Sequence, residues 1–278
     1  MKGESMDLVR QLQEQYPKDD DRHNEVINKC RAFDSIFPKR SRPSSRAAFL
    51  FRYDGEPLWK NEFEKVLRDT DALLGETRSE GPFFCGSDIT AADVAWAPFL
   101  ERYAAQLPCL HDGLLPRMDA KSYPNLVSWY NAMEDQVPAY ACRVQGNASS
   151  WRKVLVMAGY GNAGVPPSTV GRMDALEMEE SKPLSLEEEE NEQTLWDTYR
   201  EKRPWVSCSP ATEAANTMVR NRKAIVKDAL KRANEENQVP MVEEELDLAM
   251  RAMTCALGKT KFDPELTKSC REVSDVKA

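Results

Sequence analysis

One stretch of this chain, residues 82–100, constrains the fold more than any other. It contains a helix start at which Thr90 can serve as the N-cap, while the Asp93 carboxylate can bond to the Thr90 amide in return. Ile89 and Val94 stand on either side of this capping box, at the positions of a hydrophobic staple. The rest of the stretch is apolar on almost every side, which is typical of a helix enclosed by other helices. We therefore expect a central helix with Asp93 buried at its start.

Composition excludes several classes of protein. The 278 residues are enough to bury a core, and no apolar run reaches the roughly 18 residues that a membrane span needs. The net charge of -8 argues against a nucleic acid partner, because a phosphate-binding surface needs clustered lysines and arginines. The seven cysteines form no Cys-x-x-Cys pair and only two histidines are present, so we expect neither a disulfide framework nor a metal site. Such a chain suits a reducing compartment, and we expect the cytoplasm.

Helical periodicity extends to both sides of the central helix. Apolar residues recur at spacings of three and four over residues 22–37 and 59–74, and Gly75 is well placed to end the second helix. Pro124 is a suitable first-turn residue for a further helix, whose Trp129 should face the central one. These patterns predict an all-α bundle.

The composition changes after residue 158. Glycines and prolines come first, and residues 174–201 then hold eleven acids against two bases. This balance favours a flexible, self-repelling acidic linker over residues 159–192. Two amphipathic helices follow, over residues 209–234 and 242–257, and we expect a C-terminal helical hairpin that docks on the bundle or on a partner.

The central stretch resembles a known domain. Its aromatic and glycine lead-in, its Thr-x-x-Asp start and the residues 99–102 are similar to the all-helical C-terminal domain of the glutathione transferase superfamily. Residues 123–126, Trp129 and the turn at residues 138–140 extend the likeness. The resemblance implies a remnant of a thioredoxin-like domain (1–18) and the helical domain (19–158). Composition and apolar spacing add the acidic linker (159–192) and a C-terminal helical extension (193–278).

The resemblance also implies roles for individual residues. Glu4 and Ser5 match the pair that holds the γ-glutamyl end of glutathione in this superfamily, although Ser5 could equally be a simple helix cap. Arg102 and Tyr103 would lie at the substrate cleft, and the alternative is that both are structural. Ile89, Thr90, Asp93 and Val94 would be structural residues of the helix start.

The implied activity is glutathione conjugation to a small electrophile, or reduction of such a substrate, with glutathione as co-substrate. A homodimer or a protein partner is also compatible with the resemblance. The strand-helix-strand portion that supplies the catalytic Ser, Cys or Tyr has no counterpart in the printed sequence, so the catalytic residue stays unidentified. We therefore expect a truncated form that binds glutathione weakly or not at all and shows no turnover. An upstream targeting segment would place the protein in a plastid or another organelle, and the alternative function is a non-catalytic helical docking module in a protein assembly.

Overall fold

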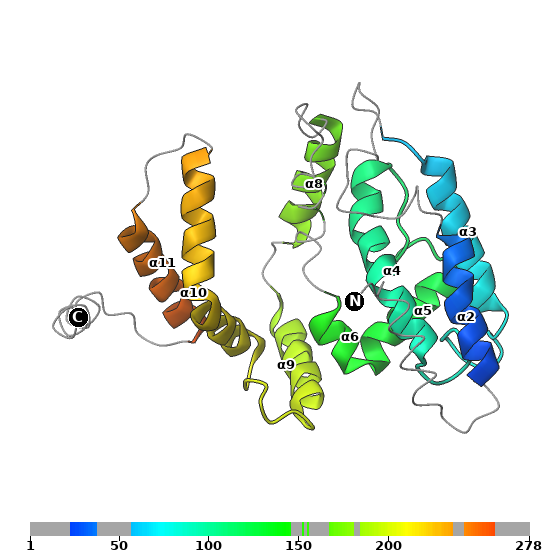
Figure 1. Ribbon diagram of the computed structural model, residues 1–278. Coiled ribbons are helices and arrows are strands. Elements are labelled where there is room, and N and C mark those ends of the chain that lie inside the picture. The colour runs from blue at the N-terminus through cyan, green and yellow to red at the C-terminus, as the bar shows by residue number, and fades with distance from the viewer. Residues whose placement is uncertain are drawn as a thin grey trace, which may run out of the picture. The chain divides into compact units, whose positions relative to one another are not determined.

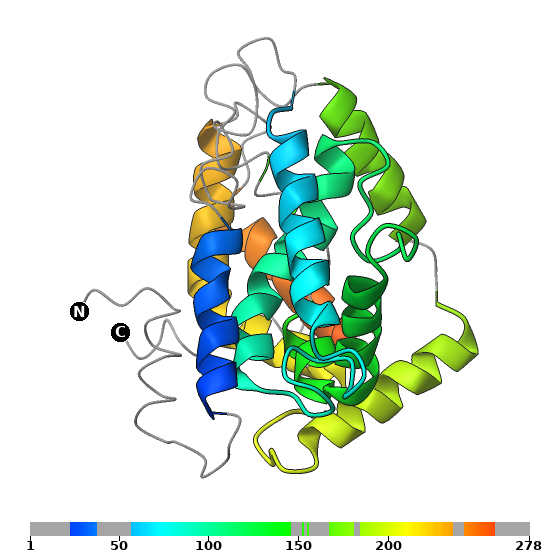
Figure 2. The same ribbon diagram turned by 90° about the vertical axis from the view of Figure 1, so that its right-hand side faces the viewer.

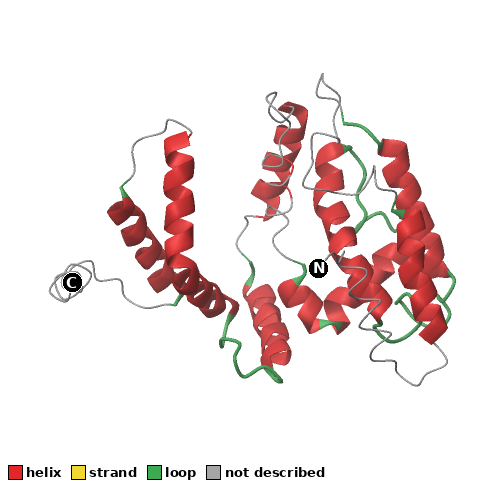
Figure 3. Cartoon of the chain, viewed as in Figure 1, coloured by secondary structure: helices red, strands yellow, loops and turns green. Residues whose placement is uncertain are grey.

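The computed structural model describes residues 23–37, 57–145, 152, 155, 167–180, 184–235 and 242–258. The chain divides into two compact units, Met1–Leu184 and Ser185–Ala278. Within the described residues every regular element is a helix (Figure 3), and an isolated β-bridge joins Phe83 and Gly86. The predicted all-α fold is confirmed.

The first unit is a helical bundle around α4. Its described helices are α2 (His23–Ile36), α3 (Lys60–Gly75), α4 (Ala91–Leu110), α5 (Pro124–Gln136), α6 (Pro138–Arg143) and α8 (Pro167–Glu180). Helix α4 packs against α2 and α8, while α3 packs against α5 and α2. Helices α2 and α3 lie side by side in both views of the chain (Figures 1 and 2).

Aromatic side chains fill the core of this unit. Trp96 of α4 is fully buried and meets the ring of Phe33 edge-on at a centroid distance of 5.3 Å. On the loop side, Phe84 packs against Trp96 at 4.8 Å and against Trp129 of α5 at 6.1 Å. Rings from α2, from α5 and from the lead-in loop (residues 82–90) therefore hold the central helix, as its apolar sequence predicted.

The expectation that α4 is enclosed on almost every side is wrong at one narrow strip. Val94 is 55% exposed and Pro98, one turn later, is also exposed. Residues four apart lie on the same side of a helix, so this strip faces solvent while the packed helices cover the rest. Ile89 is 41% exposed as well, so the two staple residues bury little surface.

The expectation that residues 159–192 form a flexible linker is also wrong for the described part of this segment, because α8 and the start of α9 (Leu186–Arg200) lie there. The acids themselves favour the start of α9: Ser185 and Glu188 form a capping box, and the first-turn acids suit the positive end of the helix dipole. Helix α8 is held by Arg172, whose guanidinium donates to the carbonyls of Cys109 and Leu110 at the end of α4. Net charge alone did not reveal these local interactions.

The second unit contains α9, α10 (Pro210–Glu235) and α11 (Glu243–Leu257). The predicted hairpin is confirmed, since α10 packs extensively against α11. Ser209 caps α10 by accepting a hydrogen bond from the Thr212 amide at 3.2 Å. Asp247 of α11 is buried and accepts hydrogen bonds from Arg222 of α10 and from Arg251.

None of the helices in the described parts is both long and apolar enough to cross a membrane.

Candidate functional site

The carboxylate of Asp93 is the centre of the polar contacts at the start of α4. One oxygen, Oδ2, accepts hydrogen bonds from the Thr90 amide at 2.8 Å and from the Thr90 hydroxyl at 2.9 Å. The other, Oδ1, accepts from the Phe84 amide at 3.1 Å and from Trp129 Nε1 at 2.9 Å. Asp93 is fully buried, and the predicted capping box is present.

These four bonds join three pieces of chain: the lead-in loop, the first turn of α4 and the middle of α5. An ionised carboxylate only accepts hydrogen bonds, so four converging donors match it without leaving a lone pair unused. The bond to Trp129 was not predicted from the sequence. A buried indole needs a hydrogen-bond acceptor, but Asp93 lies 36 residues before Trp129, so no local pattern pointed to it.

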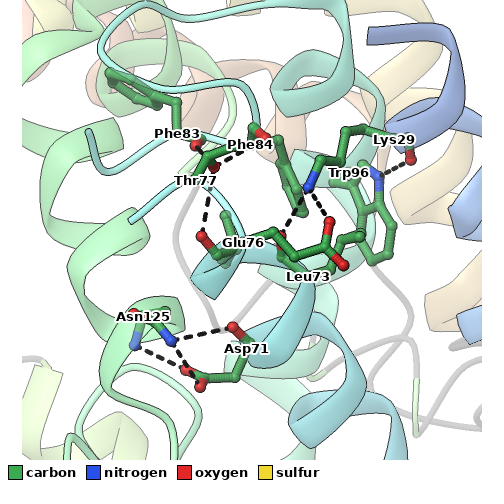
Figure 4. A network of polar contacts seen from close by, with 10 residues as sticks. Lys29, Asp71, Leu73, Glu76, Thr77, Phe83, Phe84, Trp96 and Asn125 are labelled. Carbon is green, nitrogen blue, oxygen red and sulfur yellow. Dashed lines mark hydrogen bonds and ion pairs between the residues drawn. The ribbon is translucent and has the colours of Figure 1, made fainter. Parts of the chain in front are cut away.

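The chain at the start of the lead-in loop approaches itself so closely that only glycine fits at residue 81. Gly81 has a φ of 159°, and a Cβ placed there would lie 2.4 Å from the carbonyl oxygen of Gly86. Thr77 is buried beneath the loop, where its hydroxyl lies 3.3 Å from the Phe83 carbonyl oxygen and 3.2 Å from that of Phe84 (Figure 4). These contacts hold the loop so that the Phe84 amide can donate its hydrogen bond to Asp93.

A second carboxylate caps α5 from another helix. Asp71 of α3 accepts hydrogen bonds at one oxygen from the amides of Asn125 at 2.8 Å and Leu126 at 2.9 Å. The Asn125 side chain donates back to Asp71 at 3.1 Å, and Figure 4 shows the two side chains facing each other. Tyr123, the residue at the N-cap position, offers no side-chain cap, so Asp71 replaces it. Sequence reasoning missed this contact because the two residues are 54 positions apart.

Lys29 ties α2 to the end of α3. Its ammonium donates to the Leu73 carbonyl at 2.9 Å and pairs with Glu76 at 2.7 Å, while its own carbonyl accepts from Trp96 Nε1 at 3.1 Å (Figure 4). A cation at the C-terminal end of a helix is favourable there, because the last carbonyls carry partial negative charge.

A buried ionic cluster surrounds Glu101 in the middle of α4. The Glu101 carboxylate of α4 is 4% exposed and accepts hydrogen bonds from Arg117 and from the Tyr140 hydroxyl. Arg117 also pairs with Glu134 and stacks over the Tyr130 ring, with its guanidinium carbon 4.5 Å from the ring centroid. Burial raises the pKa of Glu101 against the opposing effect of Arg117, and burial also raises the pKa of Tyr140. No local sequence pattern indicated this cluster, because Glu101, Arg117 and Tyr140 are 16 to 39 positions apart.

Residues 57–132 match the family model described as the glutathione S-transferase C-terminal domain. This part of the chain is a glutathione S-transferase C-terminal domain. The matched residues span α3, α4 and most of α5, and therefore include both Asp71 and Asp93 with the helix starts they cap. Neither the curated proteins nor the solved structures gave a match to the chain.

Two of the predicted substrate-binding residues lie in this glutathione S-transferase domain. Arg102 is half-buried on α4 with its guanidinium carbon 5.9 Å from the centroid of the Phe99 ring, and burial lowers its pKa. Tyr103 is fully buried between the rings of Phe37 at 5.0 Å and Phe63 at 5.5 Å. The expectation that Tyr103 is exposed at a cleft is therefore wrong: the helical register turns its ring into the core.

The other two predicted substrate-binding residues, Glu4 and Ser5, lie outside the described residues.

The thiols and phenols of this domain are poor candidates for ionising a substrate. Burial raises the pKa of Cys85 to about 11 and raises the pKa of Tyr130 well above its ordinary value. The Cys85 thiol and the Tyr130 phenol therefore stay protonated at neutral pH. The described side chains also include no cluster of three or more His, Cys, Asp or Glu residues that could hold a metal ion. The buried carboxylates of the described part, Asp93 and Glu101, are used in contacts within the bundle.

Proposed function

We propose that this protein takes part in glutathione chemistry: conjugation of glutathione to a small electrophile, or glutathione-dependent reduction of one. The observation that supports it is the glutathione S-transferase C-terminal domain at residues 57–132, built on the Asp93 contacts at the start of its central helix. In this proposal the helices of the first unit supply the side of the site that receives the electrophile, with Arg102 beside it. The low polarity of the surrounding rings suits an apolar second substrate.

The thiol of glutathione needs a different source of activation. A free thiol titrates near 8.5, so only a small fraction is thiolate at neutral pH without a donor that stabilises the anion. Among the described residues, the Tyr130 hydroxyl donates to the Leu100 carbonyl and the Tyr140 hydroxyl donates to Glu101. Cys85 and Tyr103 are both fully buried in the core. We therefore place the donor outside the described residues, on a thioredoxin-like partner domain or in the remaining parts of the chain, where Glu4 and Ser5 would hold the γ-glutamyl end.

Calorimetry with reduced glutathione tests the binding part of this proposal. Two proteins are compared: the full chain, and the full chain joined at its N-terminus to a thioredoxin-like domain of a glutathione transferase. We expect the joined protein to bind glutathione saturably and the full chain alone to bind weakly. If the joined protein gives no binding heat, glutathione is not the co-substrate.

A non-catalytic docking module is the second candidate. It is favoured by a specific observation: the buried charged side chains of Lys29, Asp93 and Glu101 are all used in contacts within the bundle. A domain of that kind would act through its surface. For either function we propose a reducing compartment such as the cytoplasm, since none of the six described cysteines takes part in a disulfide.

A further inference from the structure

The chain enters α3 through a turn that a bulky residue rarely adopts. Trp59, the N-cap residue of α3, has a φ of 71° and a ψ of 20°, which is the left-handed region. This conformation is unfavourable for a large side chain, and it persists only where the surrounding contacts hold it in place. The Trp59 carbonyl accepts a helical hydrogen bond from the Phe63 amide at 2.9 Å. Release of this turn would therefore loosen the start of α3.

His111 supplies a contact that holds this turn. It is the C-cap residue of α4, and its ring lies against the Phe63 ring at a centroid distance of 5.7 Å. The ring atom Nε2 is 3.0 Å from the carbonyl oxygen of Leu58, the residue directly before Trp59. A carbonyl only accepts hydrogen bonds, so Nε2 carries the hydrogen and Nδ1 of the neutral ring is bare. One imidazole thus joins the end of α4 to a turn 53 positions earlier in the chain.

The surroundings of His111 suit a neutral ring better than a charged one. The side chain is buried, and three charged groups act on it: Lys60 and Glu64 of α3, and Arg172 of α8. The two cations oppose a positive charge on the ring, and Glu64 favours one. Burial lowers the pKa of His111 and the hydrogen bond to Leu58 opposes that effect, but the pKa stays below its ordinary value.

We propose that His111 is a pH-sensitive latch on the start of α3. The neutral ring holds the Leu58 carbonyl and, through it, the left-handed turn at Trp59. In acid the ring takes up a proton from water at Nδ1, which adds a charge and a second N–H donor in a buried site beside two cations. The imidazolium then moves out to solvent and the turn relaxes. This proposal goes beyond glutathione chemistry and does not depend on it.

The direction of the pH effect follows from which form binds the proton. In the open form the His111 ring is in water and titrates near 6.5, whereas the closed form keeps the ring neutral to lower pH. The open form therefore binds more protons, and opening becomes more favourable as the pH falls below about 6.5. Uptake of one proton raises the ratio of open to closed molecules by up to about tenfold per pH unit.

Amide hydrogen exchange of the full chain, measured by NMR between about pH 7.5 and 5, tests the latch. The Phe63 amide is the probe, because it bonds to the Trp59 carbonyl. Protection factors are compared, so that the direct effect of pH on exchange is removed. The matched reference is the Val127 amide, which makes the equivalent bond to the Tyr123 carbonyl at the start of α5. We expect the protection of Phe63 to fall by up to about tenfold per pH unit below about 6.5, and that of Val127 to stay unchanged.

Two variants of His111 separate the proton from the contact. His111→Gln keeps a side-chain N–H that can donate to Leu58 but takes up no proton, so the protection of Phe63 should no longer depend on pH. His111→Phe keeps a ring and removes the donor, so Phe63 should be poorly protected at every pH. His23→Gln removes the other histidine of the chain and is the control, which should keep the parent profile.

Equal protection of Phe63 at about pH 7 and 5 in the parent overturns the proposal. So does a parent-like pH dependence in His111→Gln, or a loss of protection at Phe63 and Val127 together, which is general acid unfolding. If His111→Gln does not fold, an NMR titration of the two imidazoles of the parent replaces it, with His23→Gln assigning the signals. We expect His111 to titrate below about 6.5, and titration at or above that value overturns the latch.

Discussion

At the residue scale, the first unit depends on a few buried carboxylates that accept backbone and indole hydrogen bonds. Asp93 has four donors, from Thr90, Phe84 and Trp129, and no exposed surface. Asp93→Asn keeps the shape but turns an amide NH2 toward those donors, so we expect a loss of roughly 2 to 4 kcal/mol in the free energy of unfolding. Urea unfolding followed by circular dichroism measures it. The exposed Asp88→Asn is the control and should change the stability by less than about 0.5 kcal/mol.

Thr90→Ala removes only the hydroxyl part of the capping box. The backbone amide of residue 90 can still donate to Asp93, so we expect a smaller loss in the free energy of unfolding, about 1 kcal/mol, as for other N-cap substitutions. A Thr90→Ala protein that unfolds at the same urea concentration as the parent would contradict the assignment of Thr90 as the N-cap.

Asp71 tests capping between helices. Asp71→Ala leaves the amides of Asn125 and Leu126 at the start of α5 without their acceptor, and we expect a loss of about 1 to 2 kcal/mol in the same urea experiment. Asp69→Ala removes only a partly exposed pair with Lys65 one turn away, and should cost about 0.5 kcal/mol or less. Equal losses in the two variants would show that Asp71 is an ordinary surface acid.

At the element scale, the docking of α8 on α4 depends on Arg172. Its guanidinium donates to the last carbonyls of α4, which would otherwise lack partners. We expect Arg172→Ala to speed amide hydrogen exchange across residues 167–180 while the exchange of α2 and α3 stays unchanged. The exposed Asp174→Asn, on the same helix, should leave all of these rates as they are. Unchanged exchange of α8 in the Arg172 variant would contradict this role.

The α10 and α11 hairpin should weaken in acid. Burial alone would raise the pKa of Asp247, but hydrogen bonds from Arg222 and Arg251 outweigh it and lower the pKa below the ordinary value. The ionised form therefore stabilises the folded hairpin at neutral pH, and that contribution is lost as the pH falls through the ordinary carboxyl range toward the folded pKa. Asp247→Asn should lower stability at neutral pH and flatten its dependence on pH below about 4. Glu244→Gln, an exposed neighbour, should keep the parent profile.

Helix starts and apolar spacing were predictable from the sequence, since both depend on residues within one or two turns. The Thr90 and Asp93 box, the Ser209 cap and the all-α class follow from such local patterns. The contacts of Asp71 with α5, of Lys29 with α3 and of Arg117 with Glu101 join residues far apart in the chain, so no local spacing indicated them. The helices at residues 167–180 and 186–200 were missed because a count of acids does not show which of them cap or dock.

At the scale of the whole molecule, the chain combines a glutathione S-transferase C-terminal domain with a second compact unit that carries the hairpin. Because these units are separate clusters of contacts, damage in one should not spread to the other. We expect Asp93→Asn to speed hydrogen exchange in α4 and α5 and to leave α10 and α11 unchanged. Faster exchange in α10 and α11 as well would show that the two units fold as one.

We propose that the first unit takes part in glutathione chemistry and that the group that ionises the thiol lies outside the described residues. Conjugation of glutathione to a generic aromatic electrophile tests this claim most directly, with the full chain and the same chain joined to a thioredoxin-like domain assayed side by side. We expect turnover above the uncatalysed rate for the joined protein and none for the full chain alone. Robust turnover by the full chain would show that it carries its own donor. A joined protein that binds glutathione and still shows no turnover would contradict the assignment and favour the docking module.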